Sequence, residues 1–220
     1  MHFEFLIEDT SGQRMLEALM PKLLGEYRKP HTWRFHSYKG IGHIPRGLRG
    51  QTEPQKRILL DQLPRILNGY GSAYSHTPNE YAVFVICDLD DRCLVAFRRE
   101  LDEILNRCSP QPSTRFCIAI EEGEAWLLGD VCAIRRAYPN VKSSVLDIYQ
   151  NDSICGTWEL LADAVYAGGA KALKAKGWQA IGAQKSIWAE AIAPAIDVER
   201  NLSPSFQYFR RKLTEFTVNS

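Results

Sequence analysis

The stretch YAVFVICDLDD, residues 81–91, predicts the fold class of this chain of 220 residues. Its first seven residues are apolar, which is typical of a strand covered on both faces at the centre of a parallel sheet. The run stops at Asp88, and residues 94–105 have the apolar spacing of an amphipathic helix. A buried strand that ends in acidic residues and leads into a helix predicts an α/β protein.

The same alternation of strand and helix extends in both directions along the chain. Apolar segments predict further strands at residues 2–7, 32–38 and 115–120. The first strand leads into a helix that contains Pro21 and has Thr10 and Gln13 as a capping box. Further helices are predicted over residues 54–67 and 125–138. Four such alternations indicate a mainly parallel sheet flanked by helices.

Beyond residue 150 the pattern is helical only. Helices are predicted at residues 157–167, 170–176, 185–192 and 203–216, the last with Ser203 as its N-cap. We therefore expect an α/β core over residues 1–150, with a basic loop insertion near 39–53. Residues 151–220 are expected to form a helical C-terminal extension packed on that core.

Composition is that of an ordinary globular protein, with 45% hydrophobic and 24% charged residues. No apolar run approaches the ~18 residues of a membrane span, and the N-terminus lacks the basic start of a signal peptide. The six cysteines contain no Cys-x-x-Cys pair, which predicts reduced thiols rather than zinc ligands or disulfides. We expect a cytoplasmic protein with no membrane partner.

Charge is distributed unevenly although the formal net charge is only +1. Residues 21–57 hold nine basic side chains and two acidic ones, whereas residues 80–130 hold eleven acidic side chains and five arginines. A basic segment beside an acidic one predicts a rim that binds a polyanion around a centre that binds a cation.

Acidic residues follow the predicted strands repeatedly. The carboxyl ends of parallel strands meet at one edge of a sheet, so side chains from distant segments are expected to converge there. Grouped carboxylates repel one another unless a cation neutralises them, and hard oxygen ligands suit Mg²⁺ or Mn²⁺. Each acid taken alone has an alternative interpretation as a helix cap. The candidate metal ligands are Glu8, Asp88, Asp90, Glu122 and Glu124.

The basic segment has two interpretations. Aromatic side chains, including Trp33 and Phe35, alternate there with histidines and cations, as in surfaces that bind a phosphate backbone and stack on bases. The alternative is that Trp33 and Phe35 belong to the core of a strand. The candidate nucleic-acid-binding residues are Arg28, Lys29, Lys39, His43, Arg46 and Arg49.

Glu8 and the Asp88-x-Asp90 pair resemble the Toprim pattern, in which a glutamate and an Asp-x-Asp assemble a Mg²⁺ site for phosphodiester chemistry. The segments FLIEDTSG (5–12), CDLDD (87–91), IEEGEAWLLGD (120–130) and KSIWAEAIAPAIDVERNLSPSFQYF (185–209) resemble a bacterial family, domain of unknown function 4276, which is considered Toprim-like. The resemblance implies a Toprim-like, Rossmann-like sheet. It also implies similarity to the nuclease half of overcoming-lysogenization-defect systems and an ABC-type ATPase partner in phage defence.

The chain departs from the Toprim pattern at Gly12, where these nucleases commonly have a second acid, so that a two-metal site needs Asp9 or Glu122 as a substitute. The expected function is hydrolysis of phosphodiester bonds in DNA or RNA, with Glu8 positioning or deprotonating a water. Lys185, expected at the head of a helix, is the candidate for holding the scissile phosphate.

Two alternatives remain. One is a non-catalytic subunit that binds nucleic acid or a partner through a degraded Toprim site. The other is a different phosphoryl-transfer enzyme on the same sheet. The sequence leaves a homo-oligomer open.

Overall fold

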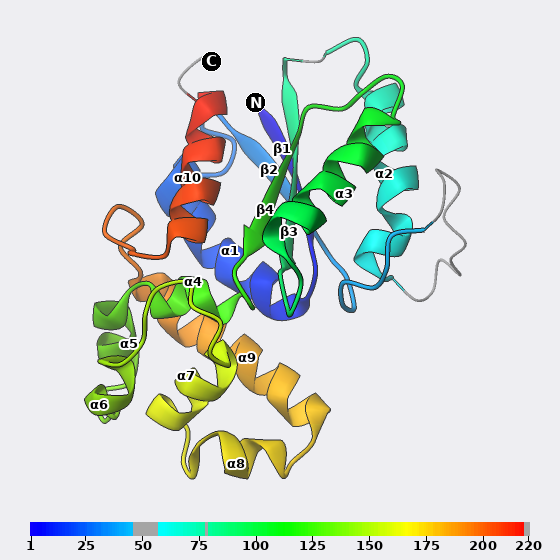
Figure 1. Cartoon of the computed structure of the whole chain (residues 1–220). Coiled ribbons are helices and arrows are strands. Elements are labelled where there is room, and N and C mark those ends of the chain that lie inside the picture. Colours follow the sequence, from blue (N-terminus) through cyan, green and yellow to red (C-terminus); the bar gives the residue numbers. More distant parts are fainter. Residues whose placement is uncertain (46–56, 78, 218–220) are drawn as a thin grey trace.

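The computed structural model describes residues 1–45, 57–77 and 79–217, and these form a sheet between two layers of helices (Figure 1). The sheet has four strands in the order β2-β1-β3-β4, and every pair is parallel. This confirms the predicted α/β class. The strands are β1 (His2–Ile7), β2 (Thr32–Ser37), β3 (Tyr81–Asp88) and β4 (Thr114–Ala119).

Helices cover both faces of the sheet. One face packs against α2 (Leu59–Ala73) and α3 (Leu94–Asn106). On the other face lie α1 (Thr10–Leu24) and α10 (Pro204–Thr217), with α9 (Trp178–Ile192) packed against α1. Shorter elements complete this layer: α4 (Glu124–Leu128), α5 (Val131–Ala137), α6 (Ser143–Leu146), α7 (Thr157–Val165), α8 (Gly169–Lys174) and the 3₁₀ helix η2 (Ala193–Ala195).

The unbroken apolar run in β3 reflects its central position in the sheet. Phe84 and Ile86 point into the core beneath α1 and α10, whereas Val83 and Val85 point into the core beneath α2 and α3. Because successive side chains of a strand alternate between faces, a strand covered on both sides needs apolar residues at every position.

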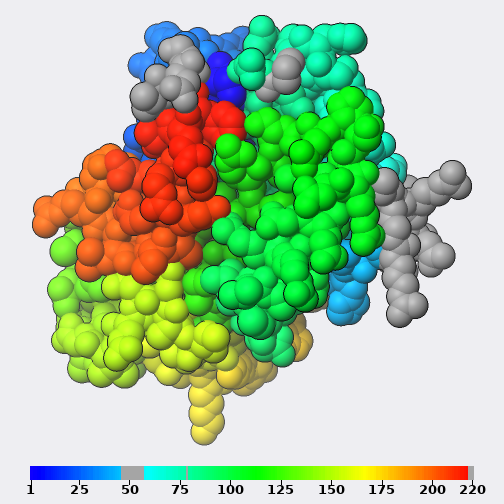
Figure 2. Space-filling view, turned by 45° about the horizontal axis from the view of Figure 1, so that its top comes forward, coloured from blue at the N-terminus to red at the C-terminus, as the bar shows by residue number. Residues whose placement is uncertain are grey.

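The C-terminal helix α10 is part of the main core. The Phe209 ring stacks on Trp126 at a centroid distance of 5.1 Å and meets Phe84 at 6.0 Å and Phe5 at 6.4 Å. Ser203 caps the helix as predicted, since its Oγ accepts the Phe206 N–H at 3.2 Å. Figure 2 shows α10, in red, lying against the green segment that contains α3 and β4.

Two predicted helix boundaries were wrong. Asp9, not Thr10, is the N-cap of α1, because its Oδ1 accepts the Gly12 N–H at 2.7 Å. The single helix predicted over residues 125–138 is two helices, because α4 ends at Leu128 and Asp130 accepts the Ala133 N–H at 2.9 Å to begin α5.

Two further predictions concern the bounds of α2 and the position of Pro21. The helix predicted over 54–67 covers Leu59–Ala73, and residues 54–56 lie outside the described part. Pro21 lies within α1, which continues to Leu24. Among the described residues, no helix is both long and apolar enough to cross a membrane.

We expect Phe209→Ala to lower the free energy of unfolding by about 3–5 kcal/mol, because it leaves a cavity among three aromatic rings. Chemical denaturation measures this. Leu202→Ala is the matched control, since Leu202 is 71% exposed just before the same helix and its truncation should change stability by less than about 0.5 kcal/mol. Equal effects of the two substitutions would contradict the placement of α10 in the core.

Candidate functional site

The parallel pairing of β1 with β3 brings Glu8 and Asp88 together at the carboxyl edge of the sheet. Ile7 is in register with Ile86, and the Glu8 N–H donates to the Ile86 carbonyl at 3.0 Å. The Glu8 Oε2 accepts the Asp88 N–H at 2.9 Å. Two residues that are eighty positions apart therefore meet, as the strand pattern predicts.

Both carboxyl groups lie in a poorly solvated environment. Burial raises the pKa of Glu8 to about 7, and the charges of Asp90 and Asp9 act in the same direction. Burial, followed by the neighbouring charge of Glu8, raises the pKa of Asp88 well above its usual range. The pair therefore retains a proton near neutral pH unless a cation offsets its charge.

Lys185 supplies one such positive charge from α9. Its Nζ lies 3.0 Å from the nearer carboxylate oxygen of Glu124 and 3.3 Å from that of Glu122, and its side chain is 13% exposed. Burial alone lowers the pKa of Lys185, but the carboxylates of Glu124 and Glu122 hold it above the usual value. Burial also raises the pKa of Glu122 to about 7.

The expected position of Lys185 at a helix head was wrong, because α9 begins seven residues earlier, at Trp178. Lys185 instead lies near the middle of α9, where a rigid helix fixes its direction. The structure thus brings together Glu8, Asp88, Glu122, Glu124 and Lys185 through hydrogen bonds, ion pairs and electrostatic coupling.

Two neighbouring acids have structural roles. Asp9 Oδ1 accepts the Gly12 N–H, and its Oδ2 accepts the Ser11 hydroxyl at 2.6 Å, so Asp9 caps α1. Glu121 accepts the backbone N–H groups of Cys155, Gly156 and Thr157 and so fixes the start of α7. Sequence analysis missed this role of Glu121.

An unusual backbone conformation holds Asp90 beside the Glu8–Asp88 pair. Its φ is 51°, in the left-handed region, and its N–H donates to the Glu121 carbonyl at 2.9 Å. Within the described residues its carboxylate has no hydrogen bond or ion pair, and its charge acts on Glu8. Asp90 is therefore a carboxylate free to bind a ligand at this edge.

A cavity of about 20 Å³ lies at the site and is lined by Glu8, Asp9, Gly12, Asp88 and Gly123, among others. This volume fits about one water molecule or one small ion. In the residues that the structure describes, no group of three or more His, Cys, Asp or Glu side chains is arranged to hold a metal ion. Mg²⁺ commonly uses only one or two carboxylates and keeps several waters, so the Glu8–Asp88 pair fits its donor chemistry.

The predicted nucleic-acid-binding residues do not form one surface. Arg28 and Lys29 precede β2 and so lie at the amino edge of the sheet, opposite Glu8. Lys39 and His43 follow β2 at the carboxyl edge, where the neighbouring Gly40 N–H donates to the Glu8 carbonyl at 3.0 Å. Arg46 and Arg49 lie outside the described residues.

The aromatic residues of β2 agree with the alternative interpretation, in which they belong to the core of a strand. Trp33 and Phe35 are partly buried against the core on the α1 side. His36 Nε2 lies 2.8 Å from Glu4 Oε2, and Glu4 is almost fully buried. These side chains thus contribute to the stability of the fold.

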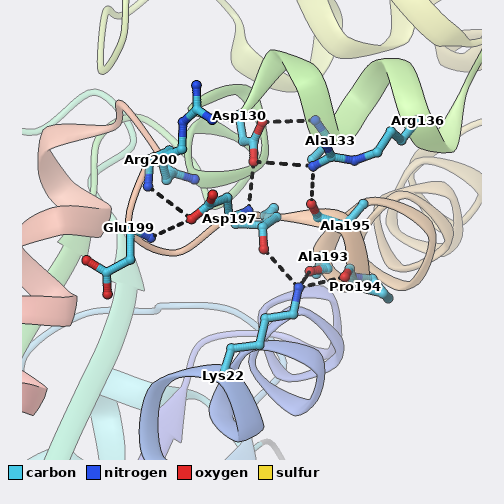
Figure 3. Close-up of polar contacts among 12 residues, drawn as sticks. Lys22, Asp130, Ala133, Arg136, Ala193, Pro194, Ala195, Asp197, Glu199 and Arg200 are labelled. Carbon is cyan, nitrogen blue, oxygen red and sulfur yellow. Dashed lines mark hydrogen bonds and ion pairs between the residues drawn. The ribbon is translucent and has the colours of Figure 1, made fainter.

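A second polar cluster, which joins η2 to α1 and α5, is also structural (Figure 3). Lys22 Nζ donates to the carbonyls of Ala193, Pro194 and Ile196 at 3.3, 2.6 and 2.8 Å. Asp130, besides capping α5, accepts the Asp197 N–H at 2.8 Å. The acids that line the adjacent cavity of about 500 Å³ are thus already hydrogen-bonded to the backbone.

The raised pKa values predict how stability depends on pH in the absence of metal. A carboxyl group whose pKa rises on folding binds more protons in the folded state, so the free energy of unfolding falls as pH rises. For Glu8 this loss runs from its ordinary pKa of 4.5 to about 7. Asp88→Asn removes one charge of the pair and should stabilise the metal-free protein at pH 8 by roughly 1–3 kcal/mol.

Thermal unfolding in chelator at pH 5 and pH 8 tests this expectation. Asp91→Asn is the matched control, because Asp91 is an exposed acid three positions away and its replacement should keep the wild-type pH dependence. An Asp88→Asn protein with unchanged stability at pH 8 would show that the pair carries no unfavourable charge.

Comparison with known proteins identifies the family. No curated protein and no solved structure gives a significant match to the chain. One family model, a domain of unknown function, DUF4276, matches residues 7–214 and so includes the Glu8–Asp88 pair and Lys185. The chain belongs to the family of the domain of unknown function DUF4276.

Proposed function

We propose that this protein is a nuclease that hydrolyses phosphodiester bonds with the help of Mg²⁺ or Mn²⁺. The observation that carries the proposal is the contact between Glu8 and Asp88, two partly buried acids whose pKa values are raised at the carboxyl edge of the sheet. Without a cation, such a pair lowers the stability of the fold. Natural proteins retain groups that lower stability chiefly at functional sites.

The chain's own residues suit the proposed reaction. Glu8 and Asp88 would hold the cation, with Asp90 as the free carboxylate beside them. When bound, the cation supplies positive charge that stabilises the charge developing on a phosphodiester oxygen. A carboxylate that holds the cation also lies within reach of water bound to it, so Glu8 would position or deprotonate the attacking water.

Lys185 is suited to a role at the phosphate. Its ammonium is held rigidly by Glu122 and Glu124 and acts electrostatically on Asp88. A cation fixed in this way offsets part of the negative charge that a bound phosphate would otherwise meet at this edge. Cytoplasmic phage defence with an ABC-type ATPase remains part of the proposal and is supported by the Toprim resemblance alone.

A non-catalytic binding subunit is the second candidate, and specific observations favour it. Gly12 supplies no acid, and a Cβ added there would lie 2.9 Å from the Ile7 side chain. Asp9 caps α1, and each of its carboxylate oxygens already accepts one hydrogen bond within the chain. One cation and one basic residue suffice to bind a phosphate, whereas many nucleases use two cations.

Incubation with plasmid, single-stranded DNA and RNA in Mg²⁺, Mn²⁺ or chelator tests the proposal. We expect cleavage that requires the divalent ion and that falls at least ~100-fold in Asp88→Asn, since one ligand of the cation is lost. Asp91→Asn should cut at the wild-type rate. Binding of nucleic acid without strand scission, under every metal and also with an ATPase partner added, would instead establish the binding subunit.

A further inference from the structure

Trp178 is unlike the other tryptophans of the chain. Trp126, Trp158 and Trp188 are buried and Trp33 is half-buried, whereas Trp178 is 81% exposed. A tryptophan side chain gains a large amount of free energy when it leaves water, so a fully solvated one on a well-ordered helix is costly to keep. Tryptophan is enriched at binding interfaces, where its ring leaves water.

The position of Trp178 on α9 relates it to the carboxylate site. Trp178 and Lys185 are seven residues apart, which places them on one face of the helix about 10 Å apart along its axis. Farther along the same face, Ala189 and Ile192 are buried in the core. The residues on this face of α9 are thus buried in the core at one end, lie at the site at Lys185 and are exposed to solvent at Trp178.

The surface between these two residues is open. Gly182 occupies the same face of α9 one turn after Trp178, and no atom lies within 4 Å of the position that a Cβ would take there. Figure 1 shows α9 passing below the ends of the strands, and its first turns pack against α8. We define the stripe that runs from the exposed Trp178 and Gly182 to the largely buried Lys185 as the α9 track.

The charge around the α9 track suits a polyanion. Residues 164–189 include four lysines, of which Lys174 pairs with Glu159 and Lys185 pairs with Glu122 and Glu124. Lys176 lies two positions before Trp178, and its Nζ contacts the Tyr166 hydroxyl at 2.8 Å. Lys171 and Lys174 lie on the neighbouring helix α8. An aromatic ring beside cations is the arrangement with which proteins bind single strands, whose bases are free to stack.

We propose that the α9 track binds a single-stranded nucleic acid, with one base stacked on Trp178 and the strand directed toward Lys185. The inference rests on the proposed nuclease function and specifies its substrate as a single strand. A duplex does not fit this role, because its bases are already stacked on one another and expose no ring face. DNA and RNA share the chemistry and are distinguished by experiment.

Binding of labelled thymidine and uridine dodecamers to the whole protein, in chelator, tests the proposal without cleavage. Trp178→Ala is expected to weaken binding roughly 5- to 150-fold, the equivalent of one lost base stack. Trp178→Phe, which keeps a ring, should bind within about threefold of the wild type. Ile187→Ala is the matched control, because Ile187 is 51% exposed but lies on the opposite face of α9.

A second variant acts without removing the ring. Gly182→Leu places a bulky side chain on the α9 track and is expected to weaken binding of the dodecamers. Thermal unfolding checks that each variant is folded. Parallel assays on a duplex of the same length should show weaker binding that does not depend on Trp178.

Several results would overturn the proposal. They are wild-type affinity in Trp178→Ala, an equal loss in Ile187→Ala, an equal dependence of duplex binding on Trp178, or failure of the wild type to bind either dodecamer. Conversion of a dimer to a monomer by Trp178→Ala would assign this face to a second copy of the chain. Because binding is measured in chelator, loss of the nuclease proposal alone leaves Trp178-dependent binding intact.

Discussion

The contact between the Glu8 carboxylate and the backbone of Asp88 is the constraint on which the site depends. It follows from the in-register pairing of β1 with β3, which leaves Glu8, the residue after β1, and Asp88, the last residue of β3, at the same edge. The pairing holds two acidic residues close together in a poorly solvated place, where burial raises the pKa of both. The fold thereby creates a requirement for positive charge at this edge.

The C-terminal half of the chain supplies part of the positive charge that this edge requires. Helix α9 packs against α1, so Lys185 approaches the edge of the sheet from a rigid support and pairs with Glu122 and Glu124. Helix α10 fills the same face of the sheet through Phe206 and Phe209. The division into an α/β core and a helical extension therefore matches the order of the elements along the sequence. In the folded protein, both parts share one hydrophobic core.

Much of the fold could be predicted because its signals are local or periodic. The apolar run of β3 and the repeated strand–helix order were enough to predict a parallel sheet, and the carboxyl-edge rule then brought Glu8 near Asp88. Local ambiguity limited the rest. Asp9, Thr10 and Ser11 are three consecutive residues that all make good N-caps, and only the structure shows that Asp9 caps α1.

Other features depend on contacts between distant residues. The role of Glu121 requires the backbone of residues 155–157 to fold against it, which no spacing in the sequence shows. The exposure of Trp178 depends on how far α9 extends past its neighbours, and an aromatic residue in a helical segment is more often part of a core. The basic residues were grouped because they are close in sequence, but β2 separates Arg28 and Lys29 from Lys39 and His43.

The most direct test of the account is anomalous diffraction from crystals of the protein soaked in Mn²⁺ near pH 8. The account predicts one strong manganese peak between the carboxylates of Glu8 and Asp88, at about 2.0–2.2 Å from a ligand oxygen of each. Manganese peaks only at other positions, with none between these two side chains, would contradict the claim that this acidic pair exists to bind a cation.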